Sequence, residues 1–201
     1  RKESSAASDV YKRQFYNCNK GEDFSFITGL TKMGIETIPP LVGRGVLINM
    51  AKHHGVSSMH GGQGITREDI KKAIKKQNIE LKKGDIILFH TGWTDAKLKS
   101  SPEEWGASIP GITNDAAVYL SEFKPMAVGA DTWGLGAVPP IDGDKVYYDH
   151  VTLIKENGIY ILETMDTGKL AKENVTEFMF VLGQPKLKGA VQMIINPVAL
   201  W

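Results

Sequence analysis

His150 and Glu163 are the two residues of this sequence whose types and spacing point most directly to chemistry. An imidazole beside a carboxylate can move protons or bind a metal ion. The stretch between them predicts the end of a helix, a stop at Gly158 and then a buried strand. On helical spacing His150 shares a face with Leu153 and Ile154, so its ring is expected to point inward.

The predicted strand alternates two faces, with Ile159, Ile161 and Glu163 on one of them. A carboxylate that ends an apolar strand needs a cation or hydrogen-bond donors, because an isolated buried charge is costly. His150 and Glu163 can therefore face one pocket. The alternative, which the local pattern alone favours, is a core histidine with satisfied hydrogen bonds and a Glu163 that emerges into solvent.

Polar residues also follow two other predicted strands. The apolar run 86–89 leads to Thr91, and the run 126–130 leads directly to Asp131. In open α/β sheets such strand ends commonly line the ligand crevice. Thr91 or Asp131 is therefore expected near the pocket of His150 and Glu163, which strengthens the interpretation of that pair as a site.

The composition of the chain excludes several classes of protein. The formal charge of +1 provides no basic surface for nucleic acid or an anionic membrane. The single cysteine excludes an internal disulfide and a multi-cysteine zinc site. No apolar run is long enough to span a bilayer, and no apolar core of the signal-peptide type is present, so a cytoplasmic location is expected.

The order of the predicted elements is α/β. Residues 1–14 are polar and aperiodic and are expected to form a non-native or disordered tail, followed by one domain over 15–201. Thr66 with Asp69 predicts a capped helix start, and Thr113 is expected to cap a second helix. The predicted strands are 45–50, 86–89, 126–130, 159–163, 178–182 and 191–200.

Several stretches, taken in order, resemble the cyclase family of metal-dependent hydrolases, which includes kynurenine formamidase of the bacterial type and isatin hydrolase. Each stretch is weak alone, but in this order they are fairly specific, and the resemblance runs from about Phe15 to Trp201. The matching pieces are 28–36 (TGLTKMGIE), 39–47 (PPLVGRGVL), 84–93 (GDIILFHTGW), 128–131 (VGAD), His150, 157–159 (NGI), 162–163 (LE) and 187–190 (LKGA).

This resemblance implies a swivelling β/β/α fold, a divalent metal such as zinc or manganese, and hydrolysis of an amide C–N bond in a small molecule such as N-formylkynurenine or isatin. His150 corresponds to a histidine that assists catalysis, and Glu163 to a glutamate that serves the metal centre. Trp93, Asp131 and Trp133 are candidates for the substrate pocket, which suits an aromatic amide. The alternative is that the tryptophans belong to the core and that Asp131 caps a turn.

One departure from the family pattern is important. The family's main metal motif, His-x-x-x-His-x-Asp followed by a further histidine, is absent from the sequence. Of the other histidines, His53 and His54 are adjacent and suit a surface loop, His60 lies in a glycine-rich loop, and His90 ends a strand. The chain is therefore expected to be an N-terminally truncated fragment of the enzyme, with too few ligands to bind the metal tightly or to turn over substrate.

Two other hypotheses stay open. The first is a metal-free relative that acts as a binding or assembly module. A His-x-x-x-His-x-Asp motif just upstream of Phe15 would support the enzyme, and its absence would support the module. A nucleotide-binding oxidoreductase is less favoured, because 43–45 (GRG) precedes a strand instead of following one. Family resemblance and the aromatic residues of the segment 15–26 also predict a homo-oligomer, because aromatic side chains are favoured anchors at interfaces.

Overall fold

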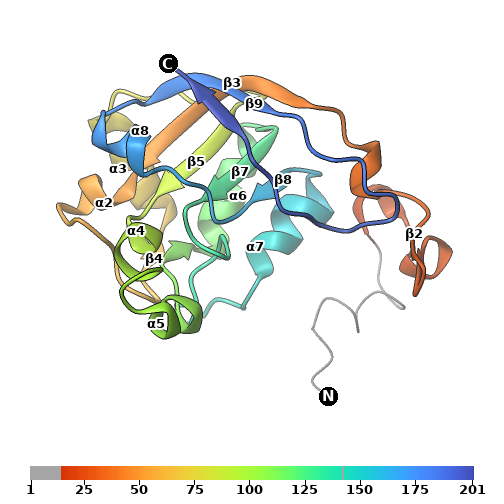
Figure 1. Ribbon diagram of the computed structural model, residues 1–201. Helices are drawn as coiled ribbons and strands as arrows, with labels where there is room; N and C mark the ends of the chain where they lie inside the picture. Colours follow the sequence, from red (N-terminus) through yellow and green to blue (C-terminus); the bar gives the residue numbers. More distant parts are fainter. Residues whose placement is uncertain (1–14, 142) are drawn as a thin grey trace.

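The computed structural model describes residues 15–141 and 143–201, and the predicted tail 1–14 lies outside the described residues. Its centre is a six-stranded mixed sheet in the order β10-β9-β3-β5-β7-β8 (Figure 1). The four strands from β3 to β8 are parallel, while β9 and β10 run antiparallel to their neighbours. The strands are β3 (Leu41–Asn49), β5 (Ile86–His90), β7 (Ala127–Ala130), β8 (Tyr160–Leu162), β9 (Glu177–Leu182) and β10 (Val198–Leu200).

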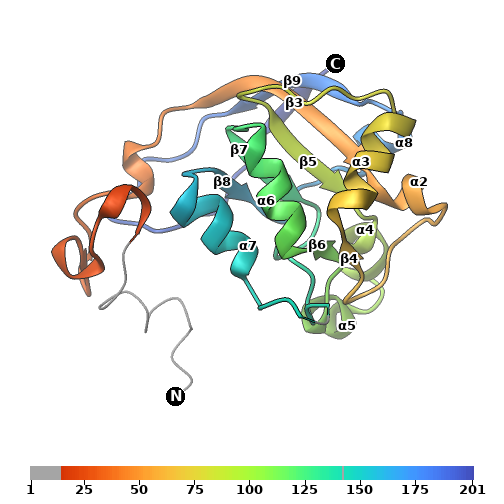
Figure 2. The same cartoon turned by 180° about the vertical axis from the view of Figure 1, so that it is seen from behind.

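Helices cover one face of this sheet, as seen from behind in Figure 2. They are α3 (Arg67–Lys76), α6 (Asn114–Glu122) and α7 (Tyr148–His150), the last continued by the π-helical turn η4 (Val151–Glu156). Their apolar side chains pack against alternate residues of the strands, including Ile87, Phe89 and Val128, in one buried cluster. The period of two along each strand therefore fixes which side chains meet the helices.

The opposite face is covered by α8 (Gly168–Lys172) and the C-terminal segment. Here the intervening residues of the same strands, such as Ile86, Leu88 and Leu162, pack with Leu170 and Phe180. No helix within the described ranges is both long and apolar enough to cross a membrane.

Shorter elements lie at the ends of the sheet. They are η1 (Tyr16–Cys18), η2 (Gly21–Asp23), β1 (Ser25–Phe26), β2 (Gly29–Leu30), η3 (Ile35–Thr37), α2 (Met50–His54), β4 (Gly64–Ile65), α4 (Trp93–Lys97), α5 (Pro102–Ala107) and β6 (Gly111–Ile112). β1 pairs with β2 and β4 with β6 in two small sheets.

The α/β prediction is confirmed, as is the capping box at the start of α3. There the side chain of Thr66 accepts from the Asp69 backbone N–H at 3.1 Å, and Asp69 accepts from the Thr66 N–H at 3.0 Å. Thr113 occupies the N-cap position of α6, but its hydroxyl donates to the Ile65 carbonyl instead of capping the helix.

Two other predictions from the pattern were wrong. Ile154 is 45% exposed, because the wider π-helical turn moves it away from the face of the fully buried Leu153. The strand expected over 191–200 pairs only at its last three residues, and Ile194 upstream of them is 94% exposed.

Candidate functional site

The structure brings His150 and Glu163 together at the carboxyl end of β8. The His150 Nε2 atom lies 3.3 Å from Glu163 Oε1. Ile159 and Ile161 pack in the cluster under the helices, so Glu163, two residues on, continues toward the same face. The contact therefore follows from strand alternation and from the helix that crosses this face.

A second carboxylate, which the sequence analysis missed, holds the other side of the His150 ring. Asp149 Oδ2 lies 3.1 Å from His150 Nδ1, and Asp149 is only 2% exposed. The aspartate directly before the histidine was the available indication in the sequence. Gly136 lies against this carboxylate, since a Cβ there would be 2.8 Å from Asp149 Oδ1. A side chain at 136 would displace Asp149.

The two carboxylates set the charge of the imidazole. Burial lowers the pKa of His150, but hydrogen bonds to Asp149 and Glu163 outweigh this effect and raise the pKa to about 9. The side chains of His150 and Glu163 remain 28% and 35% exposed. The pair can therefore exchange protons with a molecule in solvent.

The separation of His150 Nε2 and Glu163 Oε1 matches that of two ligand atoms on one metal ion, for which the imidazole must first lose its proton. Two ligand atoms at about 2.1 Å from a tetrahedral zinc ion are separated by about 3.4 Å, close to the observed 3.3 Å. Throughout 15–141 and 143–201, however, no third His, Cys, Asp or Glu ligand atom joins this pair to make a group of three. The pair fits part of a metal centre and not a whole one.

Thr91 and Asp131 form a different group, built from β5 and β7. Asp131 accepts hydrogen bonds from the Thr91 N–H at 2.9 Å, the Thr91 hydroxyl at 2.7 Å and the Gly92 N–H at 2.8 Å. Burial raises the pKa of Asp131, while these donors and the nearby His90 ring oppose the rise. The aspartate holds the turn after β5.

His90 belongs to this second group. Its Nδ1 atom lies 2.9 Å from Thr167 Oγ1 and 3.8 Å from Asp131 Oδ2. Alternation along β5 places His90 on the side of Ile86 and Leu88, opposite to the helix-covered face that Glu163 follows. The polar side chains at the strand ends therefore lie on both faces of the sheet, His90 on one and Glu163 on the other.

The predicted pocket tryptophans lie near this second group. Trp93 begins α4 and is 2% exposed, whereas Trp133 is half-buried. The indole N–H of Trp133 donates to the Trp105 carbonyl at 2.7 Å, and the Trp105 indole donates to Thr94 Oγ1 at 2.9 Å. These contacts fix the loop that follows β7 to the segment after β5.

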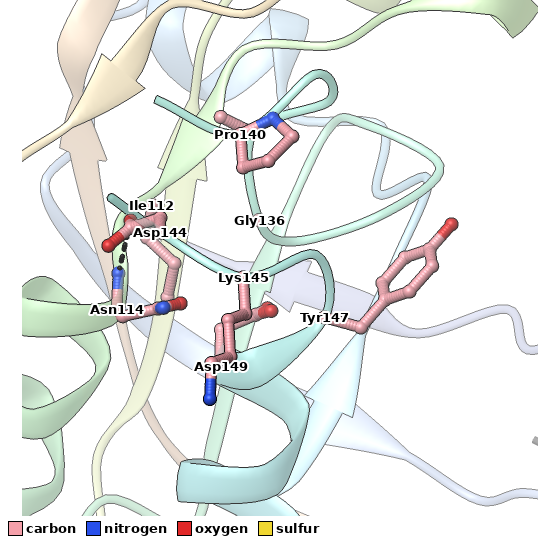
Figure 3. Close-up of a pocket in the computed structure, with 9 residues that line it drawn as sticks. Ile112, Asn114, Gly136, Pro140, Asp144, Lys145, Tyr147 and Asp149 are labelled. Carbon is pink, nitrogen blue, oxygen red and sulfur yellow. Dashed lines mark hydrogen bonds between the residues drawn. The ribbon is translucent and has the colours of Figure 1, made fainter. Parts of the chain in front are cut away.

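Figure 3 shows a small cavity beside the His150 helix. Its lining includes Asp149, Gly136 and Asn114, whose backbone N–H donates to Asp144 at 2.9 Å. Its volume of about 10 Å³ is at the lower limit for one water molecule. This cavity is too small for an organic substrate.

In open α/β sheets ligands commonly bind at the carboxyl ends of the strands, and Glu163 follows the carboxyl end of β8. The profile of the cyclase family, described as "Putative cyclase", matches residues 23–137. The chain belongs to the cyclase family. A search among curated proteins found no match.

Solved structures extend this relationship. One described as the crystal structure of a novel cyclase is 28% identical, with a TM-score of 0.83, over 95% of this chain and 64% of its own. This chain therefore spans 64% of the length of that relative. A structure described as a potential metal-dependent hydrolase with cyclase activity is 22% identical, with a TM-score of 0.60, over 82% of this chain and 69% of its own.

Isatin hydrolase A from Labrenzia aggregata is a further structural neighbour. It is 19% identical to this chain, with a TM-score of 0.64, over 87% of this chain and 69% of its own. At this identity the likeness supports the fold. The expected cyclase-type fold is therefore confirmed by both the family profile and the structural neighbours.

Proposed function

We propose that this chain is part of a metal-dependent amidohydrolase that cleaves the C–N bond of an aryl or cyclic amide. The observation that carries the proposal is the His150 ring held between Asp149 and Glu163 at 3.1 and 3.3 Å. Family membership and neighbours described as metal-dependent hydrolase and isatin hydrolase support the reaction class.

In this proposal His150 handles the proton that hydrolysis of a C–N bond must deliver to the departing nitrogen. Asp149 accepts from Nδ1 and fixes the ring, so Nε2 is the atom that exchanges the proton. The partial exposure of His150 and Glu163 leaves this atom within reach of a substrate. Glu163 would hold the metal, which suits a hard carboxylate ligand.

A divalent zinc or manganese ion would supply a bound water of lowered pKa. The remaining ligands are proposed to come from a His-x-x-x-His-x-Asp segment outside the 201 residues. Trp133, which is half-buried, would contact an aromatic substrate, while Trp93 and Asp131 support the wall behind it through the turn after β5. The substrate class would be small aromatic amides of the N-formylkynurenine or isatin type.

The test compares the 201-residue chain with a chain extended upstream of Phe15 by a segment that carries this motif. Hydrolysis of isatin and N-formylkynurenine is followed with zinc or manganese present. We expect turnover by the extended chain only, with loss of at least about a hundredfold in kcat for His150→Gln, as for other acid–base residues. Turnover by the extended chain that is unchanged in His150→Gln would contradict the proposed role.

We also propose a homo-oligomer. The chain buries Phe24 but leaves Tyr16 at 47%, Phe26 at 49% and Ile27 at 100% exposure, all in one short segment. Apolar and aromatic side chains that a single copy does not cover are suited to an interface. Light scattering at increasing concentration should show a dimer or larger species, and a monomer at high concentration would contradict it.

A further inference from the structure

A second group of metal-ligating side chains lies at the end of β3, away from the His150–Glu163 pair. His53 and His54 of α2 and Asp69 of α3 each offer one ligand atom, and these atoms all lie within 4.8 Å of one another. The strands β5 and β7 separate β3 from β8, which Glu163 follows. The prediction that His53 and His54 lie in a surface loop was wrong, because both belong to α2.

Local backbone signals hold the three residues in place. The Asn49 side chain accepts from the Lys52 N–H at 2.8 Å and starts α2 directly after β3, and Gly55 ends the helix with a φ of 73°. The capping box with Thr66 fixes Asp69 in the first turn of α3. The imidazole rings of His53 and His54 have centroids 5.0 Å apart.

The histidines carry hydrogen-bonding capacity that their surroundings leave unused. The buried atoms His53 Nδ1 and His54 Nε2 have no hydrogen-bond partner among the described residues. Buried polar atoms are normally paired, so each such atom calls for an explanation. Asp69 directs one oxygen, Oδ2, to both donors of Thr66, which leaves the other oxygen as a further ligand.

The capping box alone explains the position of Asp69, but it does not explain why two unpaired imidazoles lie beside it. His53 also lines a cavity of about 360 Å³, together with Asn49 and Lys76.

We propose that His53, His54 and Asp69 bind a divalent transition-metal ion of the zinc type, at a site independent of the proposed hydrolase centre. Two imidazoles and one carboxylate are a ligand set that zinc uses, and three protein ligands leave a fourth position for water or an incoming anion. Because α2 and α3 each supply ligands, the ion would tie the end of β3 to the start of α3. The tests of this metal site do not depend on whether the chain hydrolyses a substrate.

Isothermal titration of zinc chloride tests the site in a Glu163→Gln chain, which removes the contribution of the other pair. We expect one zinc site, weakened at least about tenfold by His54→Gln and by Asp69→Asn, since changes even to residues behind metal ligands cost 10–100-fold. Asp69→Asn retains an oxygen that can cap α3, so circular dichroism should show an unchanged fold. His60→Gln, which changes an exposed histidine outside the group, is the matched control and should bind zinc as before.

Long-range ¹⁵N–¹H spectra of the unmutated chain give a second readout. Because no residue is changed, a folding defect of a variant cannot affect the result. On addition of zinc, one ring nitrogen each of His53 and His54 should shift to the metal-bound position, while those of His60 and His90 stay unchanged. Shifts at His150 would report the proposed hydrolase centre separately. Zinc affinity that is equal in the Glu163→Gln chain and in its His53→Gln/His54→Gln derivative, or zinc shifts that omit both rings, would overturn the proposal.

Discussion

His90 and His150 both lie beside a carboxylate at the carboxyl ends of the parallel strands, but their surroundings differ. The side chains of His90 and Asp131 are 9% and 4% exposed, and Asp131 accepts hydrogen bonds from Thr91 and Gly92. The side chains of His150 and Glu163 keep 28% and 35% of their surface open. The proposed function rests on the open contact, which solvent can reach, whereas the buried contact is suited to holding the fold together.

The largest expected effect falls on the buried group. Asp131→Ala removes the acceptor of two backbone N–H groups and one hydroxyl, all buried, so the free energy of unfolding should fall by about 3 kcal/mol or more. Urea denaturation measures this. Asp131→Asn keeps one oxygen for Thr91 and should lose about half as much. An Asp131→Ala chain of unchanged stability would show that this group does not hold the fold.

A smaller loss is expected from the other partner of His90. Thr167→Val keeps the shape of the side chain but removes the oxygen 2.9 Å from His90 Nδ1. An unpaired buried ring nitrogen should cost about 1–2 kcal/mol. Thr37→Val, whose hydroxyl donates to the Gly34 carbonyl at an exposed position, serves as the control in the same urea titration and should lose less.

For the partly exposed pair of His150 and Glu163, the expected effect is a dependence of the free energy of unfolding on pH. The folded pKa of His150, about 9, exceeds the unfolded value of 6.5, so its stabilisation is fully present below pH 6.5 and is lost as pH rises from 6.5 to 9. Solvent screening of this partly open site reduces the expected loss to about 1–2 kcal/mol. Thermal unfolding with EDTA present, compared with His150→Gln, measures the difference. A profile that is identical in the two chains across this range would contradict the assignment.

The smallest effect on stability is expected for Glu163→Gln. Its side chain is 35% exposed and remains able to accept from His150, so the free energy of unfolding should change by less than about 1 kcal/mol. The same substitution should lower the pKa of His150, which proton NMR of the ring detects. A destabilisation as large as that of Asp131→Ala would place Glu163 with the buried group and remove the distinction between the two histidines.

Local patterns in the sequence were sufficient for much of the fold. Alternation placed Ile159 and Ile161 on one face of β8, and the Thr66 and Asp69 pattern located the start of α3, because both signals act within a few residues. The π-helical turn that exposes Ile154 was not predicted, because the apolar pattern of this segment fits the spacing of an α-helix as well as that of a π-helix. The length of β10 depends on a partner strand, which composition does not reveal.

The candidate sites were predicted less completely, because contacts between distant segments decide them. The sequence paired His150 with Glu163, but Asp149 was overlooked although it adjoins the histidine. Thr91 or Asp131 was expected near this pair, yet the two bond to each other, and alternation along β7 directs Asp131 to the other face of the sheet. The approach of Asp69 to His53 and His54 depends on how α3 packs on α2, which no local spacing encodes.

Manganese-induced broadening of the histidine ring signals tests most directly whether the open pair, and not the buried one, is the chemical site. The titration is recorded in a His53→Gln/His54→Gln chain, so that the second metal group does not contribute, and it detects weak binding. The His150 signals should broaden at the lowest manganese concentrations, the His90 signals should broaden much later, and Glu163→Gln should abolish this order. Equal broadening of His90 and His150, or broadening at His150 that is unchanged in Glu163→Gln, would contradict the account.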